Sequence, residues 1–379
     1  MLSLIIEKKV TKIYKMKSVK GYELTRKFGK NISNNRTVLE PKNNENINGN
    51  IIKYPKANIL SKKNSHFPEK AKSNNSKIHL KNPLKEKKYK INIIISKQID
   101  KNPQYLEEYF QDIIRNIKCT ESQNICDYST NSIFSLQDNQ YINQKSRNYI
   151  IESIIYQSYL WKLNNETIYL TVNIMDRFIE KNKIQNKEYE LIGLASFFIA
   201  SKYEDIYSPD VQNLTQIFSF KYHYEEILSK ESEILKSLDY CLHYISSYKI
   251  LNLLYHLSNI DDINLKNFAD MILEISLTDL NIMKYSQIKR AIATFIFAKK
   301  LFGIKSGNNF IKLLFSYNEI EIENIKKKLF NKLKDMVILK DQQNLIAEKY
   351  RAAKFNSIFS AFEQKLNENI AKKKKSKEK

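Results

Sequence analysis

Glycine and proline are scarce in this chain of 379 residues, with six of each. Five of the prolines come before residue 104, so only Pro209 remains in the rest of the chain. A β-sandwich or β-barrel needs many turns, and turns depend on these two residue types. The scarcity argues against such architectures and predicts an all-α protein with a sizeable core, since 42% of the residues are hydrophobic.

Cysteine and long apolar segments are also rare. Cys119, Cys126 and Cys241 form no C-x-x-C pair, which argues against a zinc ribbon or a disulfide framework and predicts reduced thiols. No apolar run approaches the roughly 18 residues of a membrane span, so we expect no membrane partner.

Signatures of catalysis are missing as well. The chain has no phosphate-binding glycine loop, no nucleophile elbow and no H-E-x-x-H motif, and its five histidines are scattered. We therefore expect a binding protein without catalytic residues, cofactor or metal.

The positive charge is concentrated at the two ends of the chain. The net charge is +22, of which residues 1–90 carry +17 and residues 371–379 carry +5, so the middle is neutral. Only seven of the 63 basic residues are arginine, the side chain preferred for recognising phosphate and bases. We therefore expect solvated tails and no direct nucleic-acid contact. A lysine-rich nucleic-acid-binding protein remains the weakest alternative.

The middle of the chain contains an internal repeat. Residues 1–100 predict a disordered basic arm, and residues 104–143 predict an N-terminal helix and a linker. Leu191–Ala200 is apolar on every face, so this helix must be surrounded by others. Ala195–Lys202 aligns with Ala293–Lys300 at an offset of 98 residues. The repeat predicts two helical bundles, each with one central buried helix.

Several segments resemble the cyclin box of cell-cycle cyclins of the A/B type. The most specific are Asn165–Phe178 (NETIYLTVNIMDRF) and Ala200–Val211 (ASKYEDIYSPDV). The similarity continues through Glu231–Leu238 and, more weakly, through Ser276–Asp279 and Glu348–Tyr350. It implies two tandem five-helix cyclin boxes, at 144–242 and 243–338, then a C-terminal helix at 339–365 and a basic tail at 366–379. Both the A-type and the B-type label fit.

The resemblance also implies a function and a set of residues. Such cyclins bind and activate a cyclin-dependent Ser/Thr kinase, here expected at G2/M, as non-catalytic subunits. Lys202 and Glu231 would hydrogen-bond the kinase, Arg147 and Asp176 would form a buried structural ion pair, and Leu191 would lie in the core. The apolar contacts around Lys202 and Glu231 would come from Ile199, Tyr203, Leu235, Tyr240 and Leu242.

One part of the cyclin pattern is altered. These cyclins carry M-R-A-I-L and a following tryptophan that line a docking groove for arginine–leucine motifs. Here Ser146 and Ser153 replace the methionine and the tryptophan. We therefore expect peptide docking to be weak or of different specificity. A transcriptional cyclin or a TFIIB-like factor is the alternative within the same fold.

The two ends carry candidate signals. Arg36, Leu39 and Asn44 fit the R-x-x-L-x-x-x-x-N destruction box of mitotic cyclins, which implies a ubiquitin ligase of mitotic exit as a second partner. Lys372, Lys373, Lys374 and Lys375 form a basic run that fits either a nuclear import signal or a solvated tail. We expect the protein in the nucleus and the cytoplasm.

Overall fold

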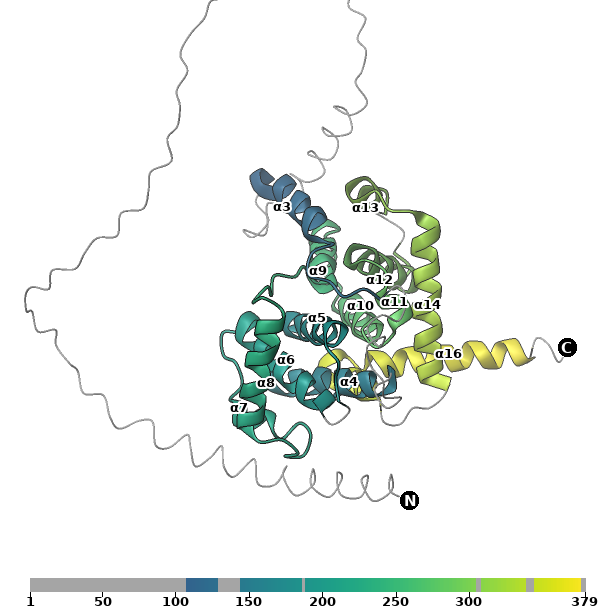
Figure 1. The fold of residues 1–379 in the computed structure, drawn as a ribbon. Coiled ribbons are helices and arrows are strands. Elements are labelled where there is room, and N and C mark those ends of the chain that lie inside the picture. The colour runs from purple at the N-terminus through teal and green to yellow at the C-terminus, as the bar shows by residue number, and fades with distance from the viewer. Residues whose placement is uncertain (1–106, 129–143, 186–187, 305–307, 339–343, 376–379) are drawn as a thin grey trace, which may run out of the picture. The chain divides into compact units, whose positions relative to one another are not determined.

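The computed structural model describes residues 107–128, 144–185, 188–304, 308–338 and 344–375. All of them belong to the compact unit Ile78–Lys379. Over these residues the chain forms α-helices and one short 3-10 helix, with no β-strand (Figure 1). The predicted all-α fold with two tandem boxes is confirmed.

The first box follows the helix α3 (Glu107–Thr120). It consists of α4 (Gln144–Trp161), α5 (Asn165–Lys181), α6 (Tyr189–Glu204), the short α7 (Val211–Leu214) and α8 (Tyr224–Ser237). In the centre lies α6, which contacts the other four helices of the box and is buried from Leu191 to Ser201. Gly193 allows the close approach of α4, because a Cβ there would lie 2.5 Å from Cγ2 of Ile150. Leu191 lies in the core, with 7% of its surface exposed.

The second box repeats this plan. It consists of α9 (Ser247–Leu257), α10 (Ile263–Ser276), the short α11 (Leu280–Met283), α12 (Gln287–Leu301), α13 (Asn308–Phe315) and α14 (Glu319–Ile338). The central helix is α12, which contacts α9, α10, α13 and α14. The starts of α5 and α10 are 98 residues apart, and so are those of α6 and α12. The offset found in the sequence is thus the spacing of equivalent helices.

Polar side chains fix where several helices begin. The side-chain oxygen of Asn164 accepts a hydrogen bond from the backbone N–H of Glu166, which caps α5. Ser246, Asp262 and Asn344 cap α9, α10 and α15 in the same way. Each cap satisfies an N–H group that has no partner within its helix.

The C-terminal segment differs from the single helix expected at 339–365. Its described residues form α15 (Leu345–Arg351), the 3-10 helix η4 (Ala353–Phe355) and α16 (Ile358–Lys375). Asn356 and Ser357 interrupt the helix with φ angles of 54° and 49°, in the left-handed region. The backbone of α16 continues through Lys372–Lys375, so helix extends into the segment expected as a tail.

Candidate functional site

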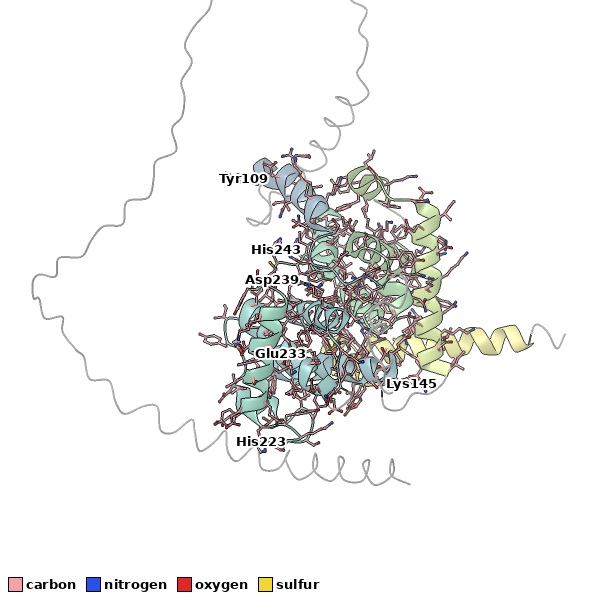
Figure 2. The ribbon with its side chains drawn as sticks, in the orientation of Figure 1. Tyr109, Lys145, His223, Glu233, Asp239 and His243 are labelled. Atoms are coloured by element: carbon pink, nitrogen blue, oxygen red, sulfur yellow. The ribbon has the colours of Figure 1, made fainter. Side chains whose placement is uncertain are left out.

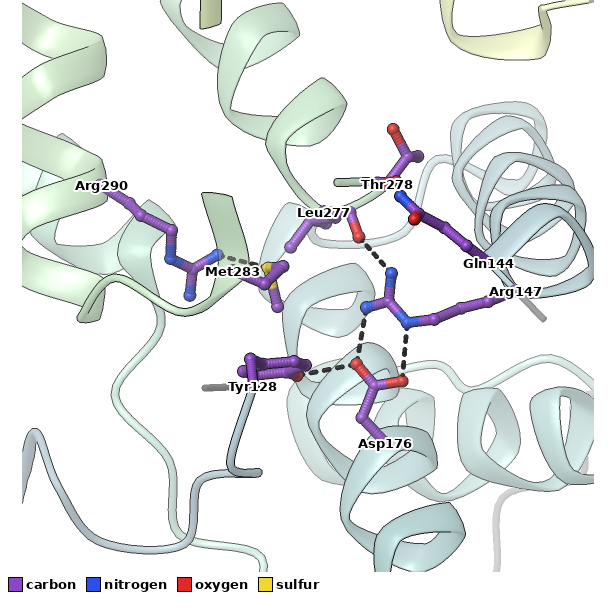
Figure 3. A network of polar contacts seen from close by, with 8 residues as sticks. All are labelled: Tyr128, Gln144, Arg147, Asp176, Leu277, Thr278, Met283 and Arg290. Atoms are coloured by element: carbon purple, nitrogen blue, oxygen red, sulfur yellow. Dashed lines mark hydrogen bonds and ion pairs between the residues drawn. The ribbon is translucent and has the colours of Figure 1, made fainter. Parts of the chain in front are cut away.

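A buried ion pair of the first box also donates a hydrogen bond to the second box (Figure 3). Nε and Nη2 of Arg147 donate hydrogen bonds to the two carboxylate oxygens of Asp176, at 2.9 and 2.6 Å, and both side chains are fully buried. Nη1 of Arg147 donates to the carbonyl oxygen of Leu277 in the second box, at 2.7 Å. The hydroxyl of Tyr128, from the segment after α3, donates to Asp176 at 2.7 Å. Arg147 therefore connects α4 to α5, as the resemblance implies, and also to the second box.

Burial and charge act in opposite directions on this network. Burial tends to lower the pKa of Arg147, but the neighbouring carboxylate of Asp176 outweighs it and raises the pKa. Burial and then Asp176 raise the pKa of Tyr128, which keeps its phenol protonated as a donor. The pair thus stays ionised and hydrogen-bonded inside the protein, where either charge alone would be strongly unfavourable.

Lys202 and Glu231 meet at the surface between two helices. Lys202 lies in the last turn of α6 and Glu231 lies in the middle of α8. Nζ of Lys202 donates a hydrogen bond to Oε1 of Glu231, and the two side chains are 42% and 12% exposed. His223 precedes α8 and Asp239 follows it (Figure 2). The two residues predicted to bind a kinase are therefore brought together.

The predicted apolar contacts differ in accessibility. Tyr203 and Tyr240 are 53% and 65% exposed, so both residues are accessible to a partner. Leu235 and Leu242 are half-buried against the core. Ile199 is only 3% exposed and lies within the core. Ile199 therefore packs in the core and is not accessible to a partner.

Several exposed apolar residues nearby were not identified from the sequence. Ile206 and Tyr207, just after α6, are 93% and 88% exposed, and as two adjacent apolar side chains they add accessible apolar area next to Lys202 in the sequence. On α8, Tyr224 and Leu228 are both 41% exposed. They precede Glu231 by seven and three residues, so the three lie along one helical stripe. This apolar spacing around Glu231 was the signal available in the sequence.

A second buried polar cluster ties the C-terminal segment to the second box. Nζ of Lys349 on α15 lies 2.6 Å from Oε1 of Glu274 on α10, with side chains 3% and 1% exposed. One turn earlier on α10, Asp270 accepts a hydrogen bond from the hydroxyl of Tyr255 at 3.1 Å. Burial, reinforced by Glu274, raises the pKa of Asp270 to about 7. Burial also raises the pKa of Glu274, and the nearby charge of Lys349 reduces this rise without cancelling it.

The part of α4 that carries the altered docking pattern, from Ser146 to Ser153, has an exposed tyrosine. Tyr149, which lies on α4 between Ser146 and Ser153, is 55% exposed, and its ring centroid is 5.9 Å from that of Phe218. The hydroxyl of Ser153 donates back to the carbonyl oxygen of Tyr149 at 2.8 Å. Between the two serines that replace the methionine and the tryptophan of the cyclin pattern, α4 therefore presents an exposed tyrosine.

Three features are absent from the residues that the structure describes. Their three cysteines form no disulfide, and no cluster of three or more His, Cys, Asp or Glu side chains could hold a metal ion. No helix among them is both long enough and apolar enough to span a bilayer. Arg36, Leu39 and Asn44 lie outside the described residues. For Lys372–Lys375 only the backbone is described.

Comparisons with known proteins agree with this architecture. Residues 112–243 match the N-terminal domain of cyclins, and residues 241–365 match the C-terminal domain. A G2/mitotic-specific cyclin of Schizosaccharomyces pombe is 31% identical over 213 residues, which cover 56% of this chain and 43% of that protein. The G2/mitotic-specific cyclin-B of Spisula solidissima is 28% identical over 265 residues, which cover 68% of this chain and 58% of that protein.

Among solved structures, a viral cyclin from herpesvirus saimiri superposes with a TM-score of 0.53 at 18% identity, covering 60% of this chain and all of that one. At this identity the likeness concerns the fold alone. The chain spans about half the length of the two G2/mitotic relatives. Both cyclin domains are matched one after the other, in the order and at the places where the two helical boxes lie. The chain therefore belongs to the cyclin family, and its relatives are G2/mitotic cyclins.

Proposed function

We propose that this chain binds a cyclin-dependent Ser/Thr protein kinase and activates it, at the transition from G2 to mitosis. The observation that carries the proposal is the ion pair of Lys202 and Glu231, which joins α6 to α8 among exposed apolar side chains. Tyrosine, of which Tyr203 and Tyr240 are exposed on this surface, is among the residue types enriched at the energetic centres of protein interfaces. The similarity to G2/mitotic cyclins supports the proposed action at the transition from G2 to mitosis.

The proposed mechanism is a shift in the conformation of the partner. Kinase catalysis needs a lysine–glutamate ion pair that involves the αC helix, together with a correctly placed Mg²⁺-binding aspartate. A rigid surface that fits αC only in its inward position favours the active state through its differential affinity. The chain would act as a regulatory subunit, with all catalytic groups on the kinase. We expect a total interface of roughly 2,000–3,500 Å².

The double substitution Lys202→Ala and Glu231→Ala tests this proposal. We expect it to abolish kinase activation, because polar groups of the kinase would be left buried without partners at a cost of roughly 2–5 kcal/mol of binding. The thermal unfolding midpoint should change little, because Lys202 is 42% exposed and neither residue fills the core. Activation is measured by adding each form of the chain to a kinase prepared without a cyclin and following the phosphorylation of a histone substrate.

A matched control uses another surface pair of the same composition. Nζ of Lys221 lies 2.6 Å from Oε2 of Glu190, at the opposite end of α6 from Lys202. Lys221→Ala with Glu190→Ala should leave activation unchanged. Purification of the tagged chain from dividing cells would identify the kinase that accompanies it. Normal activation by the Lys202/Glu231 variant would refute the proposed interface.

We also propose that the ends of the chain direct its turnover and location. Arg36, Leu39 and Asn44 would be recognised by a ubiquitin ligase of mitotic exit, and Lys372–Lys375 would serve nuclear import, giving a protein present in nucleus and cytoplasm. Arg36→Ala with Leu39→Ala should prolong the lifetime of the protein through mitotic exit and leave kinase activation unchanged. Pulse-chase half-lives measured in synchronised cells check this. Equal half-lives would mean that the motif is an accidental match.

A further inference from the structure

Lys202 has a second contact besides Glu231. Phe198 lies one helical turn before Lys202 on α6, so the two side chains are on the same face of the helix. Nζ of Lys202 lies 4.0 Å from the centroid of the Phe198 ring. The ammonium group is therefore in contact with a carboxylate from α8 and with the face of an aromatic ring from its own helix.

We propose that Phe198 is a positioning residue: its ring face holds the ammonium group of Lys202 against Glu231, so that the pair is preformed when the kinase arrives. This inference rests on the proposed function of the Lys202–Glu231 surface. It assigns a role to a residue that resemblance to the family does not single out.

The need for such a contact follows from the exposure of Lys202. Its side chain is 42% exposed, and an exposed lysine–carboxylate pair contributes little because both side chains must lose rotamer freedom. Phe198 is only 8% exposed, so packing fixes its ring. A fixed ring attracts the ammonium group through its quadrupole and limits the rotamers of the lysine before binding. The lysine side chain then loses less rotamer freedom when the kinase binds.

At the equivalent position of the internal repeat, the second box carries no aromatic ring. The offset of 98 residues places Ile296 opposite Phe198 and Lys300 opposite Lys202. The second box has its own aromatic–lysine pair one position earlier, where Nζ of Lys299 lies 5.3 Å from the ring centroid of Phe295. That lysine is only 2% exposed and so belongs to the interior. Of these two pairs, the one in the first box has its ammonium group at the surface.

The experiment measures the affinity of the full chain for a recombinant cyclin-dependent kinase prepared without a cyclin. Phe198→Leu keeps an apolar side chain and removes the ring. We expect it to weaken binding about three- to tenfold. In a Lys202→Met background the same change should weaken binding less than about 1.5-fold, because the ring has no ammonium group left to hold.

Two further measurements separate positioning from a structural role. Trifluorophenylalanine at position 198 keeps the shape of the ring but weakens its quadrupole, so it should weaken binding in the same direction with an unchanged unfolding midpoint. Phe295→Leu is the control for a purely structural loss. It should lower the unfolding midpoint and leave kinase affinity unchanged.

The outcomes distinguish the inference from the function on which it rests. Coupling between Phe198 and Lys202, together with a loss on fluorination, supports the positioning role. Equal effects of Phe198→Leu in both backgrounds, or no effect of fluorination, overturn it while leaving the proposed function intact. A wild-type chain that binds no cyclin-dependent kinase overturns both.

Discussion

At the scale of single residues, Arg147 has the largest structural role that the sequence could indicate. Its guanidinium donates to Asp176 and to the carbonyl oxygen of Leu277, with no exposure to solvent. A buried ion pair costs much of its Coulomb energy in desolvation, so its net contribution is modest while both partners are present. Removing one partner is different, because the other is then a buried, uncompensated charge.

Arg147→Ala should therefore destabilise the protein strongly. It would leave the carboxylate of Asp176 with Tyr128 as the one remaining donor of the network in Figure 3, and we expect a loss of roughly 3–5 kcal/mol in the free energy of unfolding. Urea unfolding of the full chain, followed by circular dichroism, measures this loss. Arg115 is the control, because its pair with Asp112 is exposed on both sides and should contribute less than about 1 kcal/mol. Similar losses for both variants would contradict the role assigned to Arg147.

At the scale of elements, the sequence predicted the central helices of the two boxes better than the helices of the C-terminal segment. The central helices were predictable because α6 is apolar on every face and because the repeat links it to α12. The break before α16 was not predictable, since neither glycine nor proline marks it. Asn356 adopts the left-handed conformation there, and its amide donates to Oδ1 of Asn264 at 2.7 Å. A tertiary contact, rather than a local propensity, accompanies this boundary.

The same distinction applies to the candidate site. Sequence motifs identified Lys202 and Glu231, whose pairing the structure contains. They did not single out Ile206, which is 93% exposed, and they assigned a surface contact to Ile199, although it lies in the helix that is apolar on every face and is buried. Nor could they show the contact of Arg147 with the second box, since its acceptor is a backbone carbonyl that has no side-chain signature.

The segment around α15 connects both boxes and gives a prediction at this scale. Lys349 pairs with Glu274 in the second box, while Glu348 accepts a hydrogen bond from the hydroxyl of Tyr156 on α4 at 3.1 Å. Lys349→Met should leave Glu274 buried without its cation and lower the free energy of unfolding by roughly 3–5 kcal/mol. Hydrogen exchange in α15 and α10 should become faster.

Lys354→Met is the matched control for this change. Lys354 is exposed, and its Nζ lies 5.4 Å from the ring centroid of Tyr159, so it takes part in the same segment without a buried charge. We expect its loss to cost at most about 1 kcal/mol. Unchanged exchange in α10 for the Lys349 variant would show that the ion pair does not hold the segment.

At the scale of the whole molecule, the two boxes are held together by polar contacts as well as by a continuous core. Arg147 reaches Leu277, and Ser246, which caps α9, donates to the carboxylate of Glu166 on α5. Burial raises the pKa of Glu166 to about 7, with Glu204 contributing in the same direction and the bond from Ser246 opposing it. Together with Asp270, the two boxes therefore contain two carboxyl groups that titrate near neutral pH.

These two groups predict how the stability of the whole protein depends on pH. Both pKa values lie above the ordinary values of 3.8 for Asp270 and 4.5 for Glu166, so the folded protein binds protons that the unfolded chain has already released. The free energy of unfolding should therefore fall as the pH rises from about 5 toward 7 and level off above it. Around and below pH 6.5, His256 opposes this trend, because partial burial lowers its pKa in the folded protein.

The comparison between variants isolates Asp270, because His256 contributes equally to both proteins. Asp270→Asn keeps an acceptor for the hydroxyl of Tyr255 and removes the titration, so this variant should gain stability relative to wild type at pH 8 and show a flatter profile. Asp112→Asn, on the exposed face of α3, should leave the profile unchanged. Thermal unfolding midpoints measured at half-unit intervals of pH, at constant ionic strength, check both variants. An Asp270→Asn profile with the same slope as wild type, or a variant midpoint below that of wild type at pH 8, would contradict the predicted sign.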